Sequence, residues 1–452
     1  MKYLEALISI VSRSHIISKI IQTVCNKMVI LGVRLFLIYM LAHIFTASEF
    51  GAYSIITIFY TFFMIISGLN LSTFLSRVVP GQDSLKRAQV FKVTFLFEIG
   101  LTLIVVILIF GSGLMQLLLT AIKILAYKKA FIIGLLLLVA SIALAELNAY
   151  LLAKTKITHN NKTELIAQAI WVVPLVLLWL AGVKLTVVDV FLANLIGILL
   201  SILYAFLQVE VKAWWYARFD VEILFQAIKY SVPLIIPAIV VTALRAGDRF
   251  ILAHYHNLHE VGVYSLAFSF INTLYTFSAA VIFGNMVPYV VQAHNLDNLT
   301  DRNVLLLNAY RSALIIFVVT GSVFMLFSKP IFELMARPEY LEARHVLPLL
   351  FLGTLNIILN YPSDVLLSLQ NRTMLVMGID SVCLVIGLCL DFLLIPKYSY
   401  YGAALTMFIT FGLIAAIKAF YARLWEHINL RDFLFLRKRQ VVILPPLSKI
   451  KS

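Results

Sequence analysis

The feature that most limits the fold of this chain is a series of about twelve long apolar stretches. A helix needs roughly 20 mostly apolar residues to cross a bilayer, and each stretch is about that long. The connections are short, and none is long enough for a folded domain outside the membrane. We predict spans near residues 20–45, 52–76, 90–113, 129–153, 163–183, 187–209, 226–253, 262–292, 303–328, 344–369, 373–395 and 399–424.

The composition supports this assignment. Of the 452 residues, 62% are hydrophobic and 13% are charged, whereas soluble domains have roughly 45–50% apolar and about 25% charged residues. The sequence therefore predicts an all-α polytopic membrane protein. Cys25, Cys383 and Cys389 lie in apolar stretches, and their spacing forms neither a disulfide framework nor a metal site. We expect no cofactor.

The distribution of basic residues predicts the orientation in the membrane. Most Lys and Arg residues of the connecting segments fall on one side if both termini are cytoplasmic, as an even number of spans requires. The net charge of +14 is then largely a consequence of topology and does not indicate nucleic-acid binding. The expected division is an N-terminal six-helix lobe (1–210), a cytoplasmic interfacial linker (211–225), a C-terminal six-helix lobe (226–425) and a basic cytoplasmic tail (426–452).

A short internal repeat relates the two predicted lobes. Residues 34–54 align without gaps with residues 245–265, and the phrase EFGAYS at Glu49 returns as EVGVYS at Glu260. Because six predicted spans separate the copies, both face the same side, which indicates a parallel repeat about a pseudo-two-fold axis along the membrane normal. We interpret the glycine of each phrase as the residue of a tight turn, and the glutamate as an acid at a helix start.

Four basic residues lie inside predicted spans, where a charge is costly and marks a functional candidate. Lys27 and Arg34 are seven residues apart and share one helix face. Arg245 is the repeat mate of Arg34, and Arg311 lies within the ninth span. Arginine donates bidentate hydrogen bonds to phosphate, so these four residues are candidates for a pyrophosphate site. Structural roles stay open, including an intrahelical pair of Arg245 with Asp248 and snorkelling of Lys27 towards the cytoplasm.

Four carboxylates inside predicted spans are candidates for coupling to a driving ion. They are Glu98, Glu146, Asp364 and Asp380. Asp364 follows Pro362, and such a sequence is typical of a broken helix that exposes backbone carbonyls. These acids could bind H+ or Na+, or could instead pair with the basic residues.

Several segments resemble one transporter family. The segments LAHIFTASEFGAYS and GLNLSTFLSRVVPGQD are similar to the N-terminal pattern of polysaccharide-export flippases. The segment 230–268, with Asp248, Arg249 and Phe250, resembles the seventh and eighth spans of that family, and YYGAALTMFITF resembles its last span. These flippases belong to the multidrug/oligosaccharidyl-lipid/polysaccharide transporter superfamily, and the likeness covers nearly the whole chain in span number and spacing.

The resemblance implies a MATE-like fold and a Wzx-like flippase of O-antigen, the polysaccharide of lipopolysaccharide. Such proteins move undecaprenyl-pyrophosphate-linked oligosaccharide from the cytoplasmic to the periplasmic leaflet of the bacterial inner membrane by alternating access. It implies a lipid-linked oligosaccharide, the membrane and other polysaccharide assembly proteins as partners, and no nucleic acid.

Three alternatives remain beside this interpretation. A cation-coupled multidrug antiporter of the same superfamily would need an acidic cavity, whereas the first span carries Lys27 and Arg34. A membrane enzyme of the same pathway is disfavoured because no extramembrane domain or catalytic motif is present. A lipid II flippase would work by a similar mechanism, but twelve spans instead of fourteen argue against it by resemblance. We therefore expect a protein that is not an enzyme.

Overall fold

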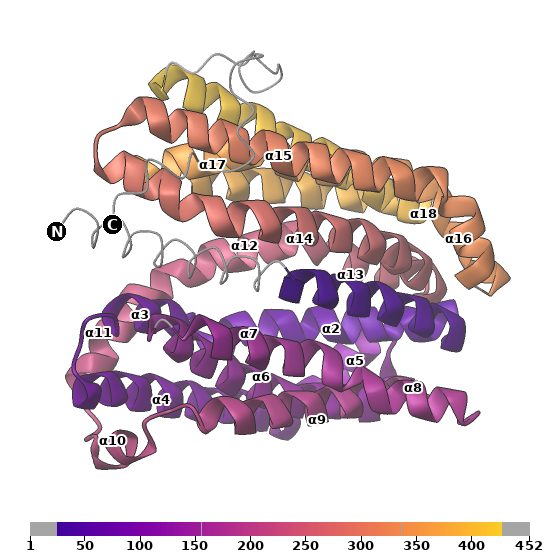
Figure 1. Ribbon diagram of the computed structural model, residues 1–452. Coiled ribbons are helices and arrows are strands. Elements are labelled where there is room, and N and C mark those ends of the chain that lie inside the picture. The colour runs from indigo at the N-terminus through magenta and orange to yellow at the C-terminus, as the bar shows by residue number, and fades with distance from the viewer. Residues whose placement is uncertain (1–24, 155, 336, 427–452) are drawn as a thin grey trace. The chain divides into compact units, whose positions relative to one another are not determined.

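The computed structural model describes residues 25–154, 156–335 and 337–426, and within these ranges the chain is helical with no β-strand. The predicted basic tail lies outside the described residues apart from Glu426. The first described helix is Cys25–Ile44. The helices that follow it are α2 (Ala47–Gly68), α3 (Leu71–Val78), α4 (Ser84–Gly111), α5 (Leu114–Ala121), α6 (Lys128–Ala153), α7 (Ile157–Leu165), α8 (Val172–Leu180), α9 (Val187–Phe206), α10 (Val211–Tyr216), α11 (Val221–Ser231), α12 (Ile235–Ala246) and α13 (Asp248–Tyr255). They are followed by α14 (Leu258–Asn295), α15 (Leu299–Leu326), α16 (Ser328–Met335), α17 (Ala343–Leu369) and α18 (Thr373–Glu426) (Figure 1).

Ten of the described helical segments are long and apolar enough to cross a membrane. One of them, Thr373–Leu424, consists of two helices that meet at a kink at Ser399, where φ is +52°. The 38-residue α14 is not among the ten, although its length alone exceeds that of a span. With α14 included and the kinked segment taken as two, the helices correspond to the twelve predicted stretches. The all-α polytopic prediction is confirmed.

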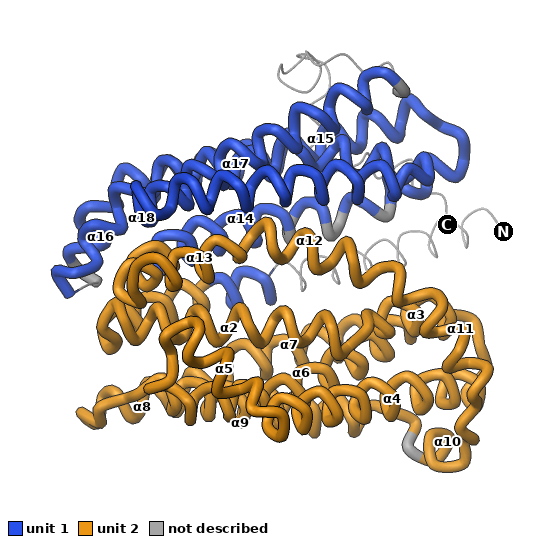
Figure 2. The backbone as a smooth tube through the Cα atoms, turned by 180° about the vertical axis from the view of Figure 1, so that it is seen from behind, with its two compact units in different colours: residues 1–31, 266–452 blue, residues 32–265 orange. Residues whose placement is uncertain are grey.

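The chain forms two compact units (Figure 2). Unit 2 comprises residues 32–265, and unit 1 comprises residues 1–31 and 266–452. The predicted lobes, 1–210 and 226–425, were defined by the internal repeat and not by packing. That division remains a prediction.

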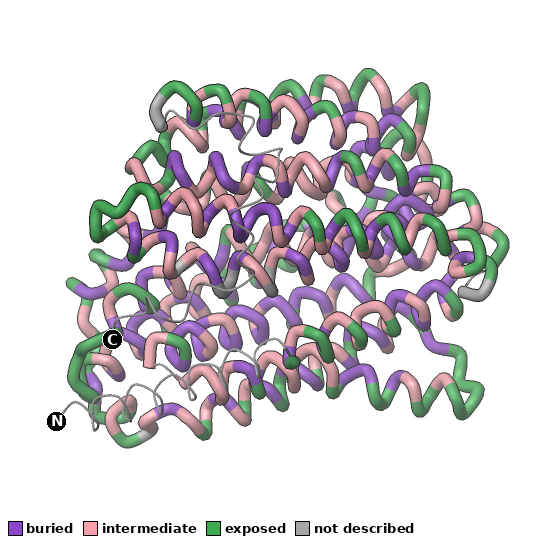
Figure 3. The backbone as a smooth tube through the Cα atoms, turned by 45° about the horizontal axis from the view of Figure 1, so that its top comes forward, coloured by how far each residue is buried: buried purple, intermediate pink, exposed green. Residues whose placement is uncertain are grey.

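Unit 2 is built around the contacts of α6 with α9, α4, α3 and α2. One apolar cluster joins Leu71, Phe74, Phe91, Leu147 and Tyr150, and the rings of Phe91 and Tyr150 stack with centroids 4.6 Å apart. Large apolar side chains on the same helices are exposed, among them those of Leu108 and Leu203. Exposed and buried positions alternate along many of the helices (Figure 3). Apolar residues on both faces are what a helix between protein and lipid requires.

The two copies of the repeated phrase contact each other within unit 2. A Cβ atom added to Gly51 would lie 2.1 Å from the Leu258 carbonyl oxygen, and one added to Gly262 would lie 1.8 Å from the Ala47 oxygen. The offset of 211 residues that relates Gly51 to Gly262 also relates Ala47 to Leu258. The contact is therefore symmetric, and only glycine permits so close an approach of two backbones.

This geometry corrects the interpretation of the two glycines. Gly51 lies inside α2 and Gly262 inside α14, so neither forms a turn. The prediction about the acid is confirmed, because Glu49 lies in the first turn of α2 and completes a capping box with Thr46. Asn257 and Glu260 are the equivalents of Thr46 and Glu49. The Glu260 backbone N–H donates to the Asn257 side chain at 3.0 Å. The glycines thus serve helix packing, and the caps fix where each helix begins.

Candidate functional site

Arg34 lies midway along the helix Cys25–Ile44 and is partly buried. Its Nη2 donates a hydrogen bond to the Gln168 side chain at 3.2 Å, and Glu164 and Tyr53 lie close enough to act on its charge. The residues on either side of Arg34 in this helix are mostly apolar, so its guanidinium lies at membrane depth. Its neutral partner there is Gln168, and Glu164 is a nearby acid. Sequence analysis did not identify Gln168, since an amide carries no charge signal.

An apolar groove of about 470 Å³ lies beside this arginine. Gly32, Val33 and Phe36 line it from the first helix, and Ala169, Val172, Val173, Val176 and Leu177 line it from the opposite side. The residues that line one side of the groove flank Arg34 in the sequence, and the residues that line the other side follow Gln168. The groove is lined by sequence neighbours of Arg34 and Gln168, and neither of these two polar side chains is among its lining residues.

Arg245 lies in the last turn of α12, and its backbone oxygen accepts a hydrogen bond from Arg249 Nη1 at 2.9 Å. The neighbouring Asp248 forms its ion pair with Arg249 at 3.0 Å and accepts a hydrogen bond from the Tyr264 hydroxyl. The intrahelical pair of Arg245 with Asp248 stays a prediction, and the structure shows a salt bridge of Asp248 with Arg249. Tyr264 belongs to the repeated phrase, so a residue of the phrase fixes the position of the Asp248 carboxylate.

The other two basic candidates belong to unit 1. Lys27 lies on the first described helix and is partly exposed, and the Arg311 side chain is buried in α15. Arg34 and Arg245 both belong to unit 2. A shared pyrophosphate site formed by all four residues remains a prediction.

Glu98 on α4 and Glu146 on α6 form a buried pair of carboxyl groups. The two residues are 3% and 0% exposed, and their carboxyl groups lie close enough to act on each other's charge. Glu98 Oε1 also accepts from the Leu71 backbone N–H at 3.1 Å, and Glu146 Oε2 accepts from the Thr94 hydroxyl at 3.0 Å. The two residues are far apart in the sequence, so no spacing rule predicts that they meet.

Asp364 on α17 and Asp380 on α18 are joined by Lys418, which lies inside the last predicted span, 399–424. Lys418 Nζ lies 2.6 Å from Asp364 Oδ1 and 2.7 Å from Asp380 Oδ1, and its side chain is 1% exposed. Asn360 Nδ2 donates to Asp364 Oδ2 at 2.7 Å. Lys418 was missed although it lies inside the last predicted span, which was the signal that should have marked it.

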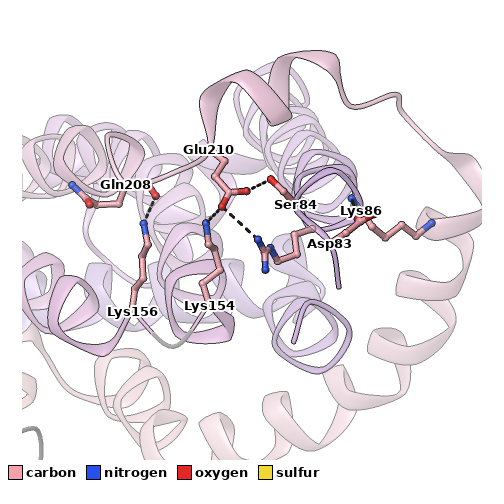
Figure 4. A network of polar contacts seen from close by, with 8 residues as sticks. Asp83, Ser84, Lys86, Lys154, Lys156, Gln208 and Glu210 are labelled. Carbon is pink, nitrogen blue, oxygen red and sulfur yellow. Dashed lines mark hydrogen bonds and ion pairs between the residues drawn. The ribbon is translucent and has the colours of Figure 1, made fainter. Parts of the chain in front are cut away.

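A third cluster surrounds Glu210, outside the apolar spans. Glu210 Oε1 accepts a hydrogen bond from Lys154 and lies 3.5 Å from Arg87 Nη2, and Glu210 Oε2 accepts from the Ser84 hydroxyl (Figure 4). Partial burial opposes ionisation, but the hydrogen bonds from Lys154 and Ser84 and the charges of Lys154 and Arg87 lower the pKa of Glu210. The carboxylate thereby connects the start of α4 and the end of α6 to α10.

No group of three or more His, Cys, Asp or Glu side chains in the described ranges could hold a metal ion. The polar groups described inside the helices are arginines and two pairs of carboxyl groups. An arginine can bind an anion, and a carboxyl pair can hold a proton or a cation.

The fold and these intramembrane charges define a multi-pass membrane protein. Residues 233–393 match the sequence profile of the MatE family. The curated proteins include no match.

Solved structures of two kinds of transporter share the fold. An inward-facing multidrug resistance MATE family transporter of the MOP superfamily aligns with a TM-score of 0.70 at 12% identity, covering 90% of this chain and 97% of that one. The lipid II flippase MurJ, in an inward closed conformation, aligns with a TM-score of 0.70 at 17% identity, covering 92% and 89%. A point mutant of the Vibrio cholerae MATE transporter VcmN aligns with a TM-score of 0.64 at 14% identity, covering 91% and 98%. At these identities the likeness shows that the chain has the fold of MOP-superfamily transporters.

Proposed function

We propose that the protein is a flippase that moves undecaprenyl-pyrophosphate-linked oligosaccharide, a repeat unit of O-antigen or another surface polysaccharide, to the periplasmic leaflet. The observation that carries this proposal is a partly buried arginine at membrane depth, Arg34, whose sequence neighbours Gly32, Val33 and Phe36 line an apolar groove. A ligand that joins a phosphate to a hydrocarbon chain matches both features. An organic cation does not match the first feature, because the arginine repels its charge.

Within this proposal the arginine binds the pyrophosphate and the groove receives the start of the lipid chain. Arg is suited to the first role because its planar fork binds two phosphate oxygens at once. Arg245, Lys27 and Arg311 supply further positive charge as the substrate moves. Two six-helix lobes, 1–210 and 226–425, alternate access in the bacterial cytoplasmic membrane with both termini cytoplasmic, and the protein carries out no covalent chemistry.

The test is complementation of a strain from which the gene has been deleted. We expect Arg34→Ala and Arg245→Ala to abolish surface polysaccharide and to accumulate lipid-linked glycan on the cytoplasmic leaflet, at unchanged protein level. Arg218 is exposed and lies outside the spans, so Arg218→Ala is a matched control that should complement fully. Normal polysaccharide in both substituted strains would refute the site.

A second function has an observation in its favour. The MatE profile match and two of the three structures described above belong to MATE proteins, which supports a cation-coupled multidrug antiporter. Such a transporter would confer resistance to cationic dyes, and the resistance would be lost in Asp364→Asn. Dye resistance together with unchanged polysaccharide in the deletion strain would establish this function instead.

A further inference from the structure

The cluster around Glu210 has more hydrogen-bond donors than one carboxylate can use. Lys154 and Ser84 donate to Glu210, while Arg87 reaches it through Nη2 at 3.5 Å. In the part of the chain that the structure describes, the buried Nε atom of Arg87 has no hydrogen-bond partner. The same holds for the hydroxyl of Tyr150, which is fully buried and lies near both Glu210 and Arg87. Buried donors without an acceptor are costly, so Glu210 alone leaves the cluster incomplete.

The cluster also carries more positive than negative charge. Arg87, Lys154 and Lys156 lie close to the single carboxylate of Glu210 (Figure 4). Burial and the charge of Lys154 lower the pKa of Lys156, and the charge of Glu210 opposes this without reversing it. Asp83, the other acid at the start of α4, caps that helix and accepts a backbone N–H at 2.7 Å. A ligand with more than one negative charge would therefore balance the cluster better than a glutamate does.

The basic members of the cluster are held in place by two long helices. Ser84 is the first residue of α4, Arg87 follows within the next turn, and Lys154 directly follows the last residue of α6. The Lys154 side chain is only 8% exposed, and its Nζ lies 5.3 Å from the centre of the Tyr150 ring. Glu210 differs from them, because it lies between α9 and α10 and its side chain is 33% exposed. The donors thus form a fixed site, and the connecting segment supplies the acid.

These donors are of the types that proteins use to bind phosphate. Arginine binds two phosphate oxygens through its planar fork, lysine adds a compact positive charge, and a hydroxyl donates one further hydrogen bond. A phosphate monoester has a charge of about −1.5 to −2 at neutral pH and three strong acceptor oxygens. It therefore offers acceptors for Arg87 Nε and the Tyr150 hydroxyl, which Glu210 leaves unpaired.

The site lies at the depth of lipid headgroups. The apolar span Ser84–Gly111 begins at it, and the span Leu125–Ala153 ends beside it. Helix α10, which packs against α4, carries Trp215 and Tyr216 with exposures of 73% and 78%. Trp and Tyr are enriched where a membrane protein passes from hydrocarbon to water. A phosphate at this position is therefore most readily supplied by a lipid, in the leaflet that the distribution of basic residues predicts to be cytoplasmic.

We propose that Ser84, Arg87 and Lys154 bind a lipid whose headgroup is a phosphate monoester, and that Glu210 occupies this site when no such lipid is bound. The bound phosphate takes the place of the carboxylate and also accepts from the Tyr150 hydroxyl. The lipid composition of the leaflet then controls how firmly the segment before α10 is held. None of these residues belongs to the proposed transport site, and the proposal does not depend on what the protein transports.

The first experiment measures binding to the purified protein in detergent by thermal unfolding. A ligand that binds only the folded protein raises the melting temperature with its concentration, and the concentration at half of the maximal rise is the midpoint. Phosphatidic acid, a monoester, should have a lower midpoint than phosphatidylglycerol, a diester, and phosphatidylcholine should have no effect. Equal midpoints for the first two lipids would overturn the monoester assignment. Inorganic phosphate, at matched ionic strength, distinguishes the source, and a midpoint equal to that of phosphatidic acid would overturn the lipid.

The second experiment removes the donors. Ser84→Ala and Arg87→Gln should each raise the phosphatidic acid midpoint roughly tenfold, the usual effect of losing a hydrogen bond to a charged group. Lys154→Met is made together with Glu210→Gln, because removal of one partner from an ion pair destabilises the fold, and should raise the midpoint relative to Glu210→Gln alone. Lys162→Met, at an exposed lysine of α7, should leave it unchanged. Midpoints like that of the wild type in the donor variants would refute the site.

The third experiment tests whether Glu210 competes with the lipid. Glu210→Gln should lower the phosphatidic acid midpoint about tenfold, because a neutral amide holds the basic groups less firmly than a carboxylate. Glu222→Gln makes the same change of charge at an exposed acid in the first turn of α11, and its midpoint should equal that of the wild type. An unchanged midpoint in Glu210→Gln, or the same decrease in Glu222→Gln, would overturn the competition. Surface polysaccharide is not measured, so failure here is distinct from failure of the flippase proposal.

Discussion

Ser54 Oγ donates a hydrogen bond to Ser265 Oγ at 2.9 Å, and the two serines are the last residues of the repeated phrase. Their separation of 211 residues is the offset of the repeat. The phrase that appears twice in the sequence therefore meets itself in space, between the starts of α2 and α14. The close approach at Gly51 and Gly262 is part of the same contact.

This contact can be tested by a disulfide. In a background in which Cys25, Cys383 and Cys389 are replaced by serine, Ser54→Cys combined with Ser265→Cys should form an intramolecular disulfide upon mild oxidation. Two hydroxyl oxygens at hydrogen-bond distance place the β-carbons within range of an S–S bridge. A mobility shift in non-reducing electrophoresis measures the product. Either single cysteine variant is the control, and absence of the bridge in the double variant would contradict the contact.

Gly51→Ala should destabilise the protein by about 1–3 kcal/mol, the usual cost of overpacking. The added methyl group would lie 2.1 Å from the Leu258 backbone oxygen, which cannot move aside as a flexible side chain can. Thermal unfolding in detergent measures the effect. Gly100→Ala is the matched control, because a Cβ atom there meets nothing within 4 Å. That variant should be neutral or stabilised by roughly 0.5–1 kcal/mol through helix propensity. Equal stability of the two variants would refute the close approach.

Lys418→Met should destabilise unit 1 by roughly 3–5 kcal/mol, the usual cost of leaving buried charges without their partner. Asp364 and Asp380 would then lie together without their cation. Replacing both acids by Asn in the same variant should recover much of the loss, since no buried charge remains. Thermal unfolding in detergent compares these with Lys162→Met, which removes an exposed lysine on α7. A Lys418→Met protein as stable as the wild type would show that the ion pairs contribute nothing.

Glu210→Gln should lower the melting temperature at neutral pH, and the difference from the wild type should shrink as the pH falls. The pKa of Glu210 is lowered in the folded state by Lys154, Ser84 and Arg87 despite partial burial. A lowered pKa stabilises the fold fully above the ordinary value of 4.5, and this contribution is lost as the pH falls through the lower folded value. Melting curves from neutral to acidic pH measure it. A constant difference over that range would contradict the assignment.

The sequence predicted the helices well because each span carries its own signal of length and apolarity. The repeat also predicted that Gly51 and Gly262 are equivalent, and the symmetric contact is consistent with this. The role of these glycines was predicted wrongly, because a glycine in a turn and a glycine against a neighbouring helix look alike in one dimension. The distinction depends on which backbone lies opposite, and no local pattern carries that information.

The polar sites were predicted as single residues and not as groups. Membrane depth alone marks Arg34, Glu98, Glu146, Asp364 and Asp380 as unusual. Their partners come from distant helices, as with Gln168 and Lys418, and are set by packing. Lys418 lies inside the last predicted span, and nothing in the sequence around it indicates that its ammonium group is buried between two acids.

The contact between the two copies of the phrase also bears on the origin of the repeat. A segment that packs on its own copy across a two-fold axis is what an isologous homodimer presents to its partner. The Gly51–Gly262 contact therefore has the form of a dimer interface enclosed in one polypeptide, as expected if two copies of an ancestral six-helix gene were fused. Fusion makes association independent of protein concentration and leaves each half free to diverge. The equivalent positions Thr46 and Asn257 carry different residues, and both cap the helix that follows.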